Sequence, residues 1–187
     1  MRRALLVGSV LVAVLAACHR SVEPPVGPQP VASIQEIMQA FVDPAADTLW
    51  EAVSSETTAA GTIDHQPQTD AEWLALRHQA LRLAEGATLL PMPGRAVAHV
   101  GRALEDSHVL GILDAEQILH RIEADRPAFA AHAQALQLAA QDVLAAIDTR
   151  DLRRYNLAGE RLDHACESCH LRYWYPDDKR PPELSRR

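Results

Sequence analysis

Residues 151–173 read DLRRYNLAGERLDHACESCHLRY, and this stretch decides the fold. Apolar or small side chains recur in it every three or four residues, which is typical of an amphipathic helix with one buried face. These positions are Leu152, Tyr155, Gly159, Leu162, Cys166, Cys169 and Tyr173. Cys166 and Cys169 therefore lie on the inward face, and whatever these thiols hold is expected to enter the protein interior. Pro176 is expected to end the helix.

Three stretches upstream show the same periodicity. The first begins after the capping box Ser33–Glu36, the second after the capping box Thr69–Glu72, and the third after Asp114. Their apolar positions are Ile34, Met38, Phe41, Ala45, Leu49 and Ala52; then Trp73, Leu76, Ala80, Leu83 and Ala87; then Ile118, Ile122, Phe129, Ala133, Leu136, Ala140, Val143 and Ile147. Each stripe predicts a helix that buries one face.

Two prolines fall inside these expected helices. The pair Asp43-Pro44 is expected to kink the first helix or to restart it, with Asp43 as the capping residue. Pro127 is expected to bend the third helix or to mark a second start. The segment 85–111 is longer than a simple helix connection, and we expect either a lid over a bound group or an ordered link.

The composition favours an all-α fold. The chain is rich in alanine and leucine, only 4% of its residues are aromatic, and no convincing alternating strand pattern occurs. Four amphipathic helices with antiparallel neighbours predict an up-down antiparallel four-helix bundle over residues 32–187. A chain of this length is sufficient for one domain with a genuine core.

The run Cys166-Glu167-Ser168-Cys169-His170 has the C-x-x-C-H spacing of a c-type haem attachment site. Two thiols at this spacing can add across the two vinyl groups of a haem, and the adjacent imidazole can then ligate the iron. The motif therefore predicts one haem c as the cofactor.

Three other chemistries use paired cysteines. A disulfide between Cys166 and Cys169 would close a loop too short to stabilise much, and the following histidine would have no purpose in it. Zinc could be held together with His164, but His164 points away from the cysteines on a helix, and structural zinc usually draws its ligands from two separated segments. A thioredoxin-type pair lacks the βαβ pattern that normally carries it.

A four-helix bundle with C-x-x-C-H on its last helix resembles the cytochrome c-prime family, the class II c-type cytochromes. The likeness extends in topology over residues 34–175, and its diagnostic residues are Cys166, Cys169 and His170. The resemblance implies thioether bonds at the two cysteines, His170 as the proximal iron ligand, and a homodimer as one assembly. Val31 and Ala32 depart from the family, which often has a basic residue before this helix to meet a haem propionate.

Met38 is our candidate for the second axial ligand. In an up-down bundle the end of the last helix lies level with the start of the first, and Met38 and His170 are each about four residues from those ends, at about 1.5 Å per residue. In the family that this chain resembles, a distal ligand comes from the first helix. Met38 could instead be a core residue that fills a gap, and Met92 and His120 are weaker rivals.

The nature of that ligand decides the expected function. His/Met ligation gives a low-spin haem of relatively high potential, suited to transfer of one electron. The alternative is an open distal face with high-spin iron, which would bind or sense a small gas such as nitric oxide.

The N-terminus predicts export. Arg2 and Arg3 precede an apolar stretch, Leu5 to Ala16, that is too short to span a bilayer, so residues 1–17 are expected to be a signal peptide. The segment before Cys18 resembles a bacterial lipobox, which implies a lipid on Cys18 and attachment to a bacterial membrane in the periplasm. The proline-rich residues 18–31 are expected to form an extended tether.

The charge balance favours a protein partner over nucleic acid. With 25 Asp and Glu against 18 Lys and Arg, the chain is acidic, so an electropositive redox partner in the cell envelope is expected. The sequence carries no paired carboxylates, nucleophile elbow or phosphate loop, so no enzymatic activity is expected. The run Arg172-Tyr173-Trp174-Tyr175 is expected to be an aromatic cluster that caps the last helix beneath the haem edge. Alternatively, Arg172 pairs with a haem propionate or the run forms an electron-exit surface.

Overall fold

The computed structural model describes residues 27–59, 61–105 and 107–177. The expected signal peptide, Cys18 and the first part of the expected tether lie outside these ranges. The described part of the chain is mostly helical, with one small antiparallel sheet. No helix within it is long and apolar enough to cross a membrane.

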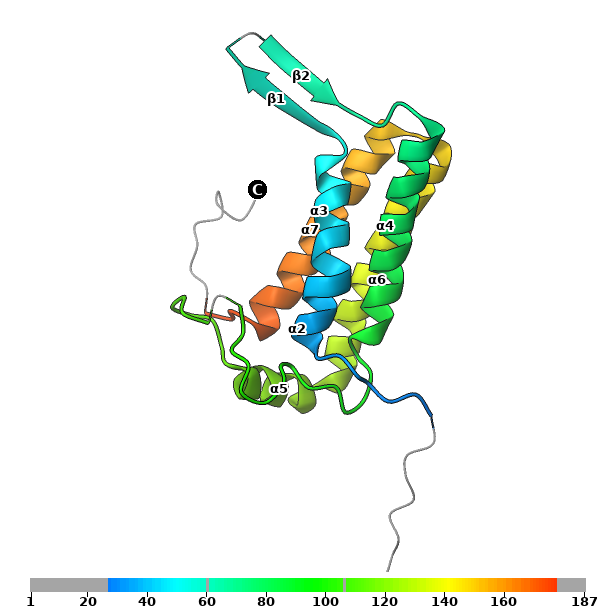
Figure 1. The fold of residues 1–187 in the computed structure, drawn as a ribbon. Helices are drawn as coiled ribbons and strands as arrows, with labels where there is room; N and C mark the ends of the chain where they lie inside the picture. The colour runs from blue at the N-terminus through cyan, green and yellow to red at the C-terminus, as the bar shows by residue number, and fades with distance from the viewer. Residues whose placement is uncertain (1–26, 60, 106, 178–187) are drawn as a thin grey trace, which may run out of the picture.

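The helical segments match the four predicted stretches. They are α2 (Ile34–Ile37), the π-helix η2 (Met38–Val42) and α3 (Asp43–Glu51), which form one continuous run; α4 (Asp70–Leu89); α5 (Ala115–Ala124) and α6 (Arg126–Thr149); and α7 (Leu152–Tyr173). These runs lie side by side, and α5 crosses their lower end (Figure 1).

Capping side chains begin these helices where the sequence predicts them. Ser33 and Thr69 both form reciprocal capping boxes with a glutamate three residues later, and Asp114 does the same with Gln117. At Pro127 the third helix breaks completely: Asp125 leaves the helical conformation, and its carboxylate accepts the backbone N–H of Ala128 to start α6. The predicted second start is therefore correct.

The first run contains a π-helix that the sequence did not predict. The N–H of Asp43 reaches the carbonyl of Met38, five residues back, and the helical run continues through the Asp43-Pro44 pair into α3. The prediction that Asp43 caps a restarted helix is wrong, because α3 follows Val42 with no side-chain cap. The extra residue in the turn also rotates the buried face, so Val42 is buried and Phe41 is 40% exposed.

A β-hairpin also departs from the all-α prediction. Strands β1 (Ser54–Thr58) and β2 (Gly61–His65) pair antiparallel, with Ser54 opposite His65. The hairpin extends beyond the end of α3 (Figure 1). Its strand residues are mostly exposed, so no hydrophobic alternation marks it in the sequence.

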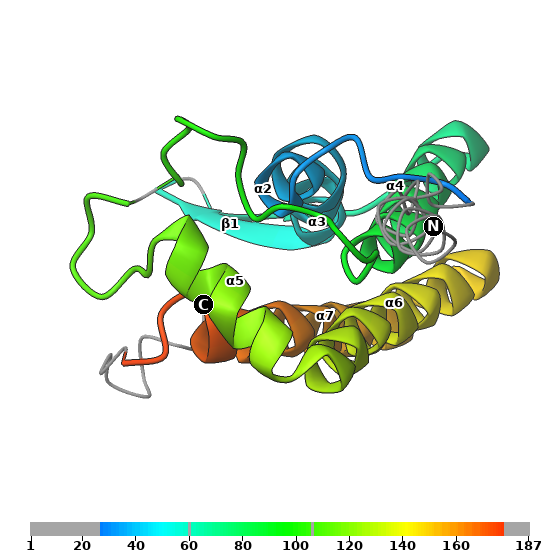
Figure 2. The same ribbon diagram turned by 90° about the horizontal axis from the view of Figure 1, so that it is seen from below.

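The core lies among the long helices. Helix α4 packs along α3 and α6, and α6 packs along α7. The predicted stripes of α4 and of α5–α6 are buried at every predicted position. Near the hairpin, Tyr155 of α7 donates to the carbonyl of Leu49 (2.6 Å), and the indole N–H of Trp50 donates to that of Gly159 (3.4 Å). Viewed from below, α2–α3 and α7 lie on opposite sides of the molecule (Figure 2).

Candidate functional site

Helix α7 carries the whole C-x-x-C-H motif on its last two turns. Asp151 starts the helix by accepting the backbone N–H of Arg154 (3.0 Å). Cys166 and Cys169 are both free thiols, partly buried and packed against the hydrophobic core. Their placement on the inward face agrees with the periodicity, and the two sulfurs form no disulfide.

Burial controls the acidity of both thiols. It raises the pKa of the Cys166 thiol to about 12, aided by the negative charges of Asp163 and Asp43. Burial likewise raises the pKa of Cys169 to about 12, against the opposing effect of Arg172. Catalytic thiol pairs need the opposite shift, because the thiolate is the nucleophile. Burial therefore favours the protonated form of both thiols, which differs from the lowered pKa of catalytic thiol pairs.

His170 and Met38 line the same cavity. The cavity has a volume of about 280 Å³ and lies between the start of the first helical run and the end of α7. Its wall consists of Gln35, Met38, Gln39, Asp43, Leu104, Glu105, Ile112, His170, Trp174 and Tyr175. The structure thus brings together the two residues that the sequence predicts as axial ligands, although they are 132 positions apart in the chain (170 − 38).

Burial favours the neutral form of the His170 imidazole, and two aromatic rings lie beside it. Its imidazole lies 6.0 Å from the ring of Trp174 and 5.9 Å from that of Tyr175, centroid to centroid. Burial lowers the pKa of His170, although Glu167 opposes this shift. A lowered pKa favours the neutral imidazole, which is the form that binds metals.

Met38 lies where α2 passes into the π-helix. It is the first residue of η2, is partly buried, and packs against the core beside the cavity. The rival candidates are placed elsewhere. The sulfur of Met92 accepts a hydrogen bond from Arg95 (3.1 Å), and neither Met92 nor the exposed His120 lines the cavity.

The connecting loop, residues 90–105 and 107–114, forms part of the cavity wall through Leu104, Glu105 and Ile112. Backbone N–H groups of Ile34 and Gln35 donate to the carbonyls of Ala96 (2.8 Å) and Val97 (3.0 Å) in this loop. At its other end, the N–H of Leu113 donates to Trp174 (2.9 Å). The loop overlaps the segment 85–111, for which the sequence suggested either a lid or an ordered link. The first five residues of that segment, 85–89, belong to α4. Those contacts make it an ordered cover over one end of the site.

Four polar side chains of this cavity were not predicted. Gln35, Gln39 and Asp43 come from the first helical run, and Glu105 comes from the loop, where it accepts a hydrogen bond from Gln39 (3.1 Å). Desolvation in the cavity wall, followed by the charges of Asp47 and Glu105, raises the pKa of Asp43. No motif marks these residues, because they come together only when the loop folds over α2.

Two other sequence hypotheses gain no support. In the part of the chain that the structure describes, no three His, Cys, Asp or Glu side chains gather as a zinc site requires. Arg172 donates to Asp125 (3.1 Å), the residue that caps α6, and is not in the cavity wall. Its guanidinium therefore ties α7 to the start of α6.

The donor set suits a c-type haem. It consists of two free thiols one turn apart, a neutral imidazole next to the second thiol, and a thioether sulfur in the wall of the cavity that this imidazole lines. The two cysteines do not themselves line that cavity but lie on the turn before it. Its volume is slightly below the range of about 300–1,000 Å³ of small-molecule sites. A macrocycle therefore requires the first helical run, α7 or the loop to move outward.

Comparison with known proteins identified no relative: no family model, curated protein or solved structure matched the chain.

Proposed function

We propose that this protein is a mono-haem c-type cytochrome that transfers single electrons. In this proposal Cys166 and Cys169 would hold one haem c through thioether bonds, and His170 and Met38 would ligate its iron in a low-spin state. The observation that carries the proposal is that His170, the last residue of the C-x-x-C-H motif, and Met38 line one cavity. When bound, the haem would supply a one-electron redox couple.

The protein's own residues would bind and shield that group. The thiols of Cys166 and Cys169 would hold the haem by addition to its vinyl groups, in which the sulfur and the thiol proton both end on the former double bond, so no oxidant would be needed. Trp174 and Tyr175 lie beside the His170 ring. Leu104, Glu105 and Ile112 of the connecting loop would form part of the wall around the bound group.

The proposed fold and location complete this picture. The succession of four long helical runs joined end to end supports an up-down four-helix bundle like that of the cytochrome c-prime family. The N-terminal sequence supports export, a lipid on Cys18, and a tether to a bacterial membrane in the periplasm. Redox proteins of the cell envelope would be the partners.

Absorption spectra of the oxidised, reduced and carbon monoxide-treated protein test this proposal. Low-spin bands that carbon monoxide does not readily change would support His/Met ligation and electron transfer. High-spin bands and rapid carbon monoxide binding would contradict it and favour the gas-binding alternative. A colourless protein would reject both functions.

A further inference from the structure

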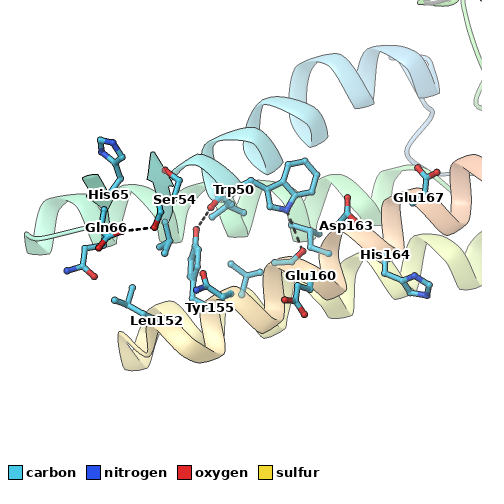
Figure 3. Close-up of a pocket in the computed structure, with 18 of the residues that line it drawn as sticks. Trp50, Ser54, His65, Gln66, Leu152, Tyr155, Glu160, Asp163, His164 and Glu167 are labelled. Atoms are coloured by element: carbon cyan, nitrogen blue, oxygen red, sulfur yellow. Dashed lines mark hydrogen bonds between the residues drawn. The ribbon is translucent and has the colours of Figure 1, made fainter. Parts of the chain in front are cut away.

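A second, larger cavity lies on another face of α7. It is an open groove of about 1370 Å³ between the hairpin, the end of α3 and the outer side of α7 (Figure 3). Trp50 and Tyr155 lie in its middle, while Asp163, His164 and Glu167 follow one another along α7 (Figure 3). No step of the proposed haem attachment uses this groove.

Part of the groove wall is apolar and accessible. Trp50 is 38% exposed and Leu171 is 39% exposed, although both are large hydrophobic side chains. The indole lies against α7, since a Cβ at Gly159 would meet Cδ1 of Trp50 at an ordinary contact distance of 3.8 Å. Exposed large apolar side chains around a concave surface are typical of protein interaction sites.

The charge of the groove has one sign. Asp64, Glu160, Asp163 and Glu167 line it, and no Lys or Arg stands among its lining residues. Burial and the charge of Glu167 raise the pKa of Asp163, while the nearby His164 lowers it. A groove lined by several carboxylates and by no Lys or Arg attracts a cationic surface and opposes an acidic one.

The groove also adjoins the proposed haem attachment site. Glu167 follows Cys166 directly in the chain, and Leu171 follows His170. A partner seated in the groove would therefore contact the two turns of α7 that carry the thiols and the proximal ligand.

We propose that this groove docks a basic segment of a protein redox partner, whose Lys or Arg side chains meet Glu160 and Asp163 while an apolar side chain covers Trp50. This inference rests on the proposed function for the identity of the partner as a redox protein. We infer a basic polypeptide as the occupant because the lining is acidic and the indole of Trp50 is exposed.

Titration calorimetry of the full-length mature protein with a hexalysine peptide tests the docking. The groove variant is E160Q/D163N, and the matched control is E85Q/E116Q, which removes the same charge from exposed positions on α4 and α5. We expect the groove variant to bind the peptide about tenfold more weakly and the control to stay within about twofold of the parent. Equal weakening in both variants would overturn the proposal, because the attraction would then be diffuse.

Two further measurements distinguish other occupants. The sequence after Asp177 contains Lys179, Arg180, Arg186 and Arg187. If deletion of residues 178–187 strengthens peptide binding about tenfold, the chain's own end occupies the groove and the proposal fails. A dimer in sedimentation that the groove variant abolishes would also overturn it. An unchanged affinity after the deletion and a monomer insensitive to the groove variant support it.

Haem content is measured by absorption on the same preparations. Because peptide binding does not depend on redox chemistry, a haem-free protein with groove-specific binding would refute the proposed function but leave the docking surface standing. Haem-loaded protein without groove-specific binding would leave the proposed function standing and refute the docking surface.

Discussion

A Cβ at Gly86 of α4 would lie 3.3 Å from the Cβ of Phe41 in η2, closer than side chains normally approach. The glycine therefore allows α4 to pack directly against the π-helix that begins with Met38. Because Phe41 Cβ is fixed to the backbone, a larger residue at position 86 must displace the π-helix itself.

The variant G86A is expected to destabilise the protein and to disturb Met38. Alanine gains about 1 kcal/mol of helix propensity over glycine, whereas overpacking costs about 1–3 kcal/mol, so we expect a net loss of up to about 2 kcal/mol. Denaturant unfolding measures the loss. In the haem-loaded protein, the absorption bands that report Met38 ligation should weaken as well.

G159A is the matched control for this experiment. Its new Cβ would meet Trp50 at an ordinary contact distance of 3.8 Å. We expect it to gain roughly 0.5–1 kcal/mol from the loss of chain flexibility, with unchanged spectra. If both glycine variants behaved alike, close packing at Gly86 would have no special role.

The variant M38A tests the second ligand against a matched control. Loss of the Met38 thioether should convert low-spin iron to high-spin and open the site to carbon monoxide. M92A removes the same side chain where it contacts Arg95 outside the cavity, so its spectra should match those of the parent. Unchanged spectra in M38A would exclude Met38 as a ligand.

Arg95 fastens the connecting loop to the end of α4 and to the segment that precedes α2. The residue is 6% exposed, and its guanidinium donates to the carbonyls of Leu89 (2.8 Å) and Ala32. Replacement by methionine would leave these acceptors unpaired, at a cost of about 2–3 kcal/mol. Limited proteolysis should then cut residues 90–114 faster. The exposed Arg102, changed to methionine, should stay within about 0.5 kcal/mol of the parent; a similar loss there would contradict this role of Arg95.

The hydroxyl of Tyr155 links α7 to α3. It donates to the Leu49 carbonyl (2.6 Å), and the variant Y155F should lose about 1 kcal/mol of stability at neutral pH. Burial raises the pKa of Tyr155 above its ordinary value of 10.0, so folding favours the neutral phenol. Its contribution is fully present below the unfolded pKa and is lost as the pH rises toward the folded pKa.

Unfolding titrations between pH 8 and 11 test the direction of this pH dependence. The stability difference between the parent and Y155F should be constant below about pH 10 and shrink or reverse above it, as the parent ionises only when unfolded. A difference that grows with pH would mean that the folded state favours the phenolate.

The sequence predicted the helices well because their signals are local. Each capping box satisfies backbone donors within four residues, and each apolar stripe records one buried face. The hairpin after α3 escaped prediction because its strands are mostly exposed and lack alternation. The π-helix was not predicted because the sequence does not mark the inserted residue. The three-to-four spacing placed Phe41 on the buried face and Val42 outside it, whereas in the structure Val42 is buried and Phe41 is exposed.

The cavity residues were predicted only in part, because only some of them belong to a local sequence signal. Cys166, Cys169 and His170 form a continuous motif, and Met38 was predicted because it lies level with His170. Glu105 and Ile112 reach the cavity on a loop that carries no periodic signal. Their placement depends on hydrogen bonds between residues more than sixty positions apart, such as Gln39 with Glu105.

Intact mass spectrometry of the denatured protein, produced in a host that matures c-type cytochromes, tests the central claim most directly. The account predicts one haem per chain that denaturation and acid extraction fail to remove, and none in C166A/C169A. A polypeptide mass with no added haem would contradict the account.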